Sequence, residues 1–213
     1  MSLTGLFLIV FLVIHLTGNL QLLAGDDGKA FNLYAYFMTT NPLIKTVSYL
    51  LYAGILLHAI QGWALWQKNR KARGSQRYAV KVNRVVGTNS FAASNMAWLG
   101  TIIFVFIVVH MYQFWLQMKL GATPMATYDG KTVKDLYALV SATYQNLGFV
   151  IFYVVSMVVI AYHLLHGFQS AFQTLGINHR KYTPFIKGVG IAYAILIPLG
   201  FASIPIIMYL QQL

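Results

Sequence analysis

The chain alternates between long uncharged apolar stretches and short segments that carry all of its charges. The stretches without Asp, Glu, Lys or Arg are Met1–Gly25, Thr46–Gln67, Val85–Met118, Leu136–His179 and Gly188–Leu213. Each is long enough for the about 20 apolar residues with which a helix crosses a bilayer. A lipid-exposed backbone must satisfy its own hydrogen bonds, as a helix does. The pattern therefore predicts an all-α polytopic membrane protein of one domain, 1–213, with transmembrane helices at about 4–24, 46–67, 92–117, 147–172 and 188–210.

Two short segments between the predicted spans carry signals of their own. Ala30–Phe37 is rich in aromatic residues and predicts a helix in the membrane interface. Thr127–Val133 has Asp129-Gly130 at its centre, which predicts a small hairpin or turn on the same side. The third and fourth uncharged stretches are longer than one membrane span. Their additional residues, 87–95 and 136–146, are polar enough to lie at or outside the interface.

The charges of the connecting segments predict the orientation of the chain. The segment after the second span holds seven basic residues and no acid: Lys68, Arg70, Lys71, Arg73, Arg77, Lys81 and Arg84. The segment after the fourth span holds Arg180, Lys181 and Lys187, whereas acidic residues offset the basic ones in the other two. Because cytoplasmic loops are enriched in Lys and Arg, the N-terminus is expected inside and the C-terminus outside. The net charge of +11 is then mainly a topology signal rather than a nucleic-acid surface.

Composition narrows the chemistry that this chain can perform within the membrane. It has no Cys, which excludes disulfides, Cys-held zinc and iron–sulfur ligation by this chain. It has no Glu, and all four Asp residues fall in predicted loops. Histidine is the side chain that remains for chemistry inside the bilayer, where ionisable groups are rare and usually functional.

The histidines are distributed over four successive spans, as His15, His58, His110, and the pair His163 and His166. At 1.5 Å of rise per residue, His15 and His110 lie about 16 and 14 Å from the nearest outer charges. His58 lies about 15 Å from the nearest inner charge, and His163 is on the inner half of a helix that runs past the membrane. The depths favour one outer pair, His15 with His110, and one inner pair, His58 with His163.

Buried pairs of imidazoles without a carboxylate or thiolate favour haem over other metal centres. Zinc takes three or four protein ligands, and copper or iron in oxygen chemistry usually takes three histidines or a carboxylate. A six-coordinate haem needs two axial ligands only. Two pairs therefore predict two non-covalent b haems in a bundle of the first four helices. A cofactor-free transporter or channel with a His-lined polar path is the alternative.

Small residues near the histidines fit a flat cofactor, although small-residue helix packing explains them as well. Gly54 and Gly62 flank His58 at four residues on either side, and Gly167 follows His163 at the same interval. This glycine favours His163 over His166 as the axial ligand. His166 is then an alternative ligand, or a hydrogen-bond partner for a propionate, a quinone or a neighbouring helix.

With these residues in place, the chain resembles a known family, the two-haem cytochrome b subunit of succinate dehydrogenase/fumarate reductase (complex II) of Bacteroidetes-like bacteria. The resemblance covers almost the whole chain and is carried by HLTGNLQ from His15, LYAGILLHAIQGW around His58, TIIFVFIVVH ending at His110, and YHLLHGFQSAFQTLG around His163. It implies the same axial pairs, with the inner haem on His58 and His163. Some members move protons through membrane glutamates, which this chain lacks.

The resemblance also implies partners and a location. A flavoprotein and an iron–sulfur subunit would dock on the cytoplasmic face of the bacterial inner membrane, and electrons would pass between them and menaquinone through both haems. The chain would thus be the electron-transfer and quinone-reactive subunit of an enzyme, with no flavin or dicarboxylate site of its own. Candidate quinone residues are Asn19, Gln21 and Tyr34. A cytochrome b of a hydrogenase or formate dehydrogenase is the alternative within redox chemistry.

Overall fold

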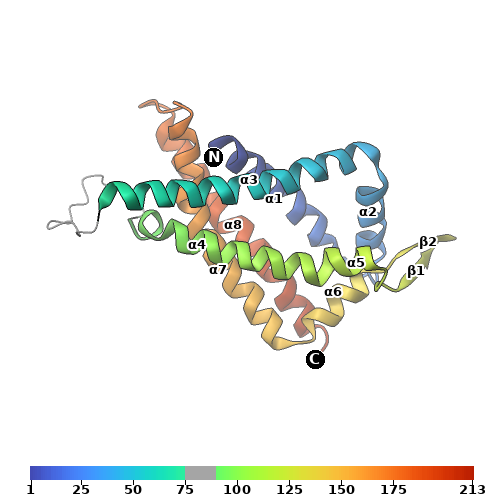
Figure 1. The fold of residues 1–213 in the computed structure, drawn as a ribbon. Helices are drawn as coiled ribbons and strands as arrows, with labels where there is room; N and C mark the ends of the chain where they lie inside the picture. Colours follow the sequence, from blue (N-terminus) through green and yellow to red (C-terminus); the bar gives the residue numbers. More distant parts are fainter. Residues whose placement is uncertain (75–89) are drawn as a thin grey trace.

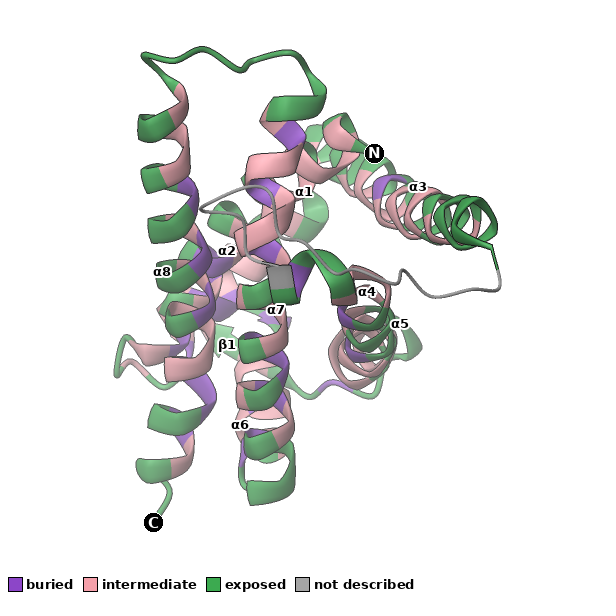
Figure 2. Cartoon of the chain, turned by 90° about the vertical axis from the view of Figure 1, so that its left-hand side faces the viewer, coloured by how far each residue is buried: buried purple, intermediate pink, exposed green. Residues whose placement is uncertain are grey.

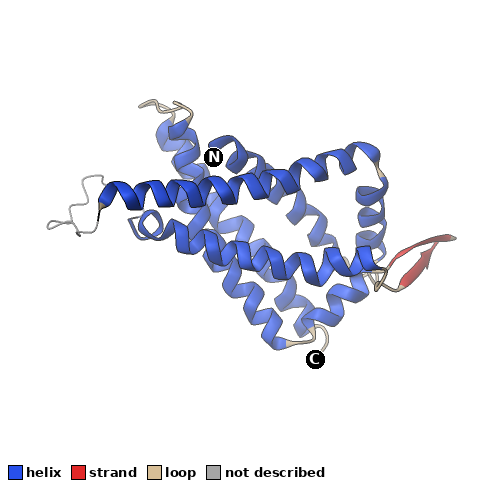
Figure 3. Cartoon of the chain, in the orientation of Figure 1, coloured by secondary structure: helices blue, strands red, loops and turns tan. Residues whose placement is uncertain are grey.

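Five long apolar helices dominate the computed structural model, which describes residues 1–74 and 90–213 (Figures 1 and 3). Within these residues the helices long and apolar enough to span a membrane cover Ser2–Leu23, Pro42–Arg73, Phe91–Leu120, Leu147–Thr174 and Thr183–Leu210. They consist of α1 (Ser2–Asn19) with the 3₁₀ turn Leu20–Leu23, α3 (Pro42–Arg73), α4 (Ser90–His110) with the π-helical turn Met111–Leu116 and α5 (Gln117–Leu120), α7 (Leu147–Thr174) and α8 (Thr183–Leu210). The predicted all-α polytopic fold is confirmed.

The second span is longer than the sequence pattern predicts. Helix α3 has 32 residues, about 48 Å, against a hydrocarbon thickness of about 30 Å. It begins after Asn41, whose side chain accepts the N–H groups of Leu43 and Ile44, and ends at Gly74, which has a φ of 70°. Lys and Arg form helices readily, and basic side chains in the last turn are stabilised by the helix dipole. The four basic residues up to Arg73 therefore lie on the helix rather than in a loop.

One end of the bundle carries a small folded cap, made of α2 (Lys29–Thr40), β1 (Met125–Tyr128), β2 (Lys131–Lys134) and α6 (Leu136–Tyr144). The strands pair antiparallel, with Tyr128 opposite Lys131. Asp129 and Gly130 between them have φ values of 50° and 77°, the positive values that a two-residue hairpin turn requires. A helix and a hairpin are both present where the sequence predicts them, and α6 covers most of the extra residues before the fourth span.

The side chain of Asn32 holds the cap together. It is fully buried, at 0% exposure, and its Nδ2 donates to Tyr128 Oη at 2.9 Å and to Asp135 Oδ1 at 2.8 Å. Its Oδ1 accepts the backbone N–H of Tyr137 at 2.9 Å. One amide thereby joins α2 to the hairpin and to the start of α6.

The termini lie at opposite ends of the bundle (Figure 1). Met1 approaches α3, where a Cβ on Gly62 would lie 3.3 Å from its Cε. Gln212 Nε2 donates to Ser141 Oγ in the cap at 3.1 Å. This arrangement is what an odd number of crossings requires.

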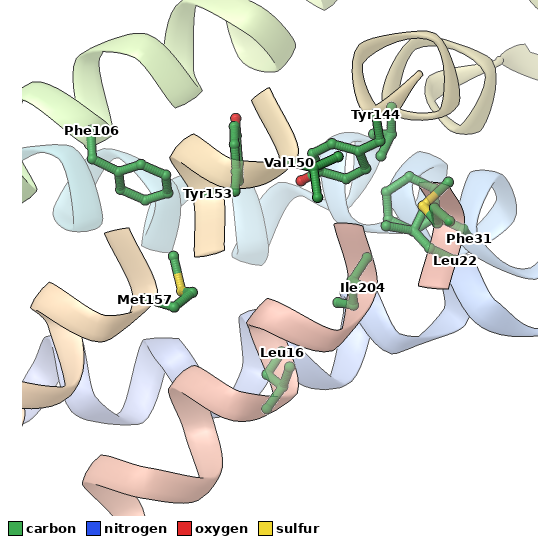
Figure 4. Packing of buried hydrophobic residues seen from close by; sticks show 11 residues of the cluster. Leu16, Leu22, Phe31, Phe106, Tyr144, Val150, Tyr153, Met157 and Ile204 are labelled. Atoms are coloured by element: carbon green, nitrogen blue, oxygen red, sulfur yellow. The ribbon is translucent and has the colours of Figure 1, made fainter. Parts of the chain in front are cut away.

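The best-packed part of the molecule is the contact of α7 with its neighbours α8, α4 and α1. Its buried cluster includes Leu16, Phe106, Tyr153, Met157 and Ile204, from four helices (Figure 4). Most other large apolar side chains are exposed along the outer helix faces (Figure 2). Lipid tails are as apolar as these side chains, so such faces need no protein cover in a bilayer.

Candidate functional site

The structure brings the membrane histidines together as two pairs. The ring centres of His15 on α1 and His110 at the end of α4 are 5.9 Å apart, with the ring planes at 86°. The ring centres of His58 on α3 and His163 on α7 are 6.4 Å apart, at 67°. Four helices therefore contribute one imidazole each. His166 is half-buried and makes no hydrogen bond or ring contact with another described residue.

Glycines on α1 and α4 show that the two pairs lie at different depths. A Cβ on Gly5 would lie 3.4 Å from Cε1 of His58, and His15 of the other pair follows ten residues later on the same helix. A Cβ on Gly100 would lie 3.8 Å from Cε1 of the second inner imidazole, and His110 again follows ten residues later. Ten residues correspond to about 15 Å along a helix. We call the pair nearer the cap, His15 with His110, the outer pair, and the other the inner pair.

Aromatic side chains pack against both imidazoles of the outer pair. The ring centres of Phe11 and Phe201 lie 5.1 and 5.5 Å from that of His15. Those of Phe106 and Phe114 lie 5.8 and 5.3 Å from that of His110. They come from α1, α4, the π-helical turn and α8, so the outer imidazoles sit in apolar surroundings.

Hydroxyl groups contact Nδ1 of one histidine in each pair. Thr4 Oγ1 donates to the carbonyl of Met1 at 2.8 Å and lies 3.2 Å from Nδ1 of His58. With its proton on the Met1 carbonyl, this oxygen can only accept from the imidazole, and the tautomer that matches it carries its proton on Nδ1 and leaves Nε2 unprotonated. In the outer pair, the hydroxyl oxygen of Tyr153 likewise lies 3.4 Å from Nδ1 of His110. Hydrogen bonds of this kind fix the tautomer of metal-binding histidines.

The other two imidazoles have different surroundings. Nδ1 of His163 is buried without a hydrogen-bond partner among the described residues. Nδ1 of His15 lies 3.2 Å from Asn19 Nδ2, which also donates to the His15 carbonyl at 2.7 Å. As placed, the amide donates to Nδ1, which puts the ring proton on Nε2. Metal binding through Nε2 of His15 therefore requires this amide contact to rearrange.

The spacing of both pairs fits two axial ligands of one metal. A first-row metal lies about 2.0 Å from an imidazole nitrogen, so two imidazoles on opposite sides of it have ring centres about 6.3 Å apart. The observed 5.9 and 6.4 Å are close to this value. Among the described residues, no group of three or more His, Cys, Asp or Glu is placed to hold a metal. Each pair thus offers two ligands, the number that a porphyrin leaves open.

The glycines near the inner pair have different neighbours. A Cβ on Gly54 would lie 3.3 Å from the ring of Phe7, and one on Gly62 would meet Met1. These two glycines allow α1 to approach α3 closely. Gly167 has no atom within 4 Å of its Cβ position, so space remains beside α7 on the side of His163.

The three candidate quinone residues lie near the cap. Asn19 contacts His15, as described above. The ring of Tyr34 lies over Gly18 of α1, where a Cβ would be 2.9 Å from Tyr34 Cζ, and burial raises the pKa of the Tyr34 phenol. Gln21 lies half-buried in the 3₁₀ turn after α1 and makes no hydrogen bond with another described side chain. The structure therefore brings Tyr34 close to the end of α1 that carries Asn19.

Several residues of the site were not singled out from the sequence: Thr4, Gly5, Gly100, Gln113 and Tyr153. Three of them stand ten residues before a paired histidine on the same helix, namely Gly5, Gly100 and Tyr153. A search for residues ten positions before each histidine would have identified these three, because ten residues of helix span the distance between the two pairs.

Comparison of the chain with protein family models, with curated proteins and with solved structures finds no match. The function proposed below therefore rests on the chain's own residues, on their geometry and on the family resemblance described above.

Proposed function

We propose that this chain is the dihaem cytochrome b anchor of a succinate:quinone oxidoreductase, with one b haem at each histidine pair. The observation that supports it best is the pairing itself. Four membrane helices contribute one imidazole each to two pairs, whose ring centres are about as far apart as those of two imidazoles that share one metal. The haems would supply one-electron carriers at two depths.

The chain's own residues bind and orient the cofactors in this proposal. His15 and His110 hold the outer one, and His58 and His163 hold the inner one. Thr4 holds the proton of His58 on Nδ1, which leaves Nε2 for the metal. The aromatic side chains around the outer pair exclude water, and a low-polarity surrounding of this kind influences the redox potential.

Partners and orientation follow from the charges and from the family resemblance. The basic residues at the end of α3 and those between α7 and α8 would face the cytoplasm of a bacterium. There they would meet a flavoprotein and an iron–sulfur subunit, and electrons would travel from these through the inner and then the outer haem to menaquinone, or in reverse. Menaquinone would react near Asn19, Gln21 and Tyr34, which lie toward the cap.

A reduced-minus-oxidised spectrum with haem quantification tests the cofactor proposal on the protein purified from membranes. We expect a b-type α band and two haems per chain. We further expect His15→Ala and His110→Ala to lose the same single haem, and His58→Ala and His163→Ala to lose the other. His166→Ala is the matched control and should retain both. Absence of haem in the wild-type protein would refute the proposal and favour a transporter or channel.

The composition of the intact complex tests the partner proposal separately. Gentle solubilisation should co-purify a flavin-containing subunit with fumarate-reducing activity. Nickel or molybdenum in the complex would instead identify a cytochrome b of a hydrogenase or formate dehydrogenase. In that case the haem proposal would stand and the succinate:quinone assignment would be wrong.

A further inference from the structure

The outer pair is connected to two further polar groups, the buried Tyr153 and the half-buried Gln113, on two helices. Tyr153 on α7 is 5% exposed, and its Oη donates to Gln113 Oε1 at 2.7 Å. The same oxygen lies 3.4 Å from Nδ1 of His110, slightly longer than the about 2.7–3.2 Å of a typical N–H···O hydrogen bond. A phenol has a single proton. Because Gln113 receives it, the oxygen acts toward His110 as an acceptor, and Nδ1 of His110 is the donor.

Local packing holds this chain of groups in place. Tyr153 lies between Phe106 and Tyr144, with ring centres at 5.2 and 5.3 Å (Figure 4). Gln113 belongs to the π-helical turn that begins directly after His110. Single π-helical turns are rare and are frequently found at functional sites. The phenol therefore cannot move without disturbing these ring contacts, and its hydrogen bond holds the amide of Gln113.

We infer that Tyr153 is a positioning residue for the outer centre, where it holds the proton of His110 on Nδ1 and fixes the direction of its Nε2 lone pair. Gln113 in turn orients the Tyr153 hydroxyl. The inference rests on the haem-binding function proposed above. A hydrogen bond from Nδ1–H makes a ligating imidazole more basic, so Tyr153 stabilises the ferric state and lowers the midpoint potential of the outer haem.

Neither histidine of the inner pair contacts Tyr153, so a substitution of Tyr153 should affect the outer haem alone. His58 has Thr4 as its acceptor, and Nδ1 of His163 has no partner among the described residues. Loss of the Tyr153 hydroxyl should therefore change one haem potential and leave the other in place.

A spectroscopic redox titration of the purified, full-length haem protein tests the inference. In Tyr153→Phe we expect two haems per chain, one midpoint potential raised and the other unchanged. Outer partners of metal ligands change affinity about 10–100-fold, and a tenfold change confined to the ferric state equals about 59 mV. Tyr144→Phe is the matched control. It also removes a buried phenol in the same cluster, but no hydrogen bond to a histidine, and should shift neither potential.

A second variant covers the case in which Tyr153→Phe loses the outer haem. Gln113→Leu keeps the phenol but removes its acceptor, so the hydroxyl proton becomes free to turn toward His110. The same potential should then rise, again with both haems bound. If both variants bind two haems and neither potential moves, the positioning role is wrong while the haem proposal stands. A wild-type protein without haem would instead overturn the proposed function itself.

Discussion

Replacement of Asn32 by Ala should loosen the cap without unfolding the membrane helices. The change removes three hydrogen bonds at 2.8 to 2.9 Å, two to neutral groups and one to the Asp135 carboxylate. Neutral hydrogen bonds contribute about 1 kcal/mol each, and one to a charged group about 1.5–3 kcal/mol. Asp135 keeps the N–H of Ala138 and Tyr128 keeps the carbonyl of Asp27, so the expected loss is the sum of the three bonds, about 3 kcal/mol or more.

Hydrogen exchange in detergent or nanodiscs measures this loss locally. Since 1.4 kcal/mol is a factor of ten, about 3 kcal/mol increases the open population of the cap roughly a hundredfold. Amide exchange in 125–140 should accelerate by that factor, whereas exchange in the middle of α7 should not change. Asn69→Ala, the same substitution at an exposed position of α3, is the control and should have no effect. If Asn32→Ala left the exchange of the hairpin unchanged, the amide would not join the elements of the cap.

Two further substitutions test the packing of α8 and the ion pair of the cap. Gly190→Ala should destabilise the protein by about 1–3 kcal/mol, because its Cβ would lie 2.7 Å from Phe168, whereas Gly188→Ala, with no atom within 4 Å, should slightly raise the apparent melting temperature in detergent. The hydrogen bond and charge of Asp129 raise the pKa of Lys29 above its ordinary 10.5. The pair therefore stabilises the cap below about pH 10.5, and this contribution is lost as the pH rises through the higher folded-state pKa. The melting temperatures of wild type and Lys29→Met should accordingly differ at pH 8 and converge at strongly alkaline pH.

The membrane spans could be predicted from the sequence because charge is excluded from the bilayer core, so the uncharged stretches mark them directly. The hairpin was predictable for a local reason as well, since Asp129-Gly130 supplies the two positive φ values of its turn. The end of α3 could not be predicted from the uncharged stretch, because no residue in its basic C-terminal part ends a helix before Gly74. The role of Asn32 was also beyond prediction. It depends on residues about a hundred positions away, which only the tertiary fold brings into contact.

The histidines illustrate the same division at the candidate site. Their depth follows from counting residues to the nearest charge, and the structure places the imidazoles in the pairs that this counting favours. Their hydrogen bonds do not follow from such counting. Whether Nδ1 meets Thr4, Tyr153 or no partner depends on the rotation of each helix about its axis, and an apolar sequence surrounded by lipid constrains that rotation weakly.

The ten-residue interval between the pairs explains how the same helices can line two sites at different depths. Helices α1 and α4 each give a histidine to the outer pair and a glycine to the inner one, and α7 gives a histidine to the inner pair and Tyr153 to the outer one. The interval corresponds to about 15 Å, roughly half of the 30 Å hydrocarbon core. A charge crossing this membrane has no carboxylate on the way, because the chain lacks Glu and its Asp residues lie near the cap. If electrons cross, as we propose, two centres about 15 Å apart replace one long transfer by shorter ones. A Cβ on Gly5 or Gly100 would lie in ordinary contact with an inner imidazole, at 3.4 or 3.8 Å, so the histidines rather than the glycines set the two depths.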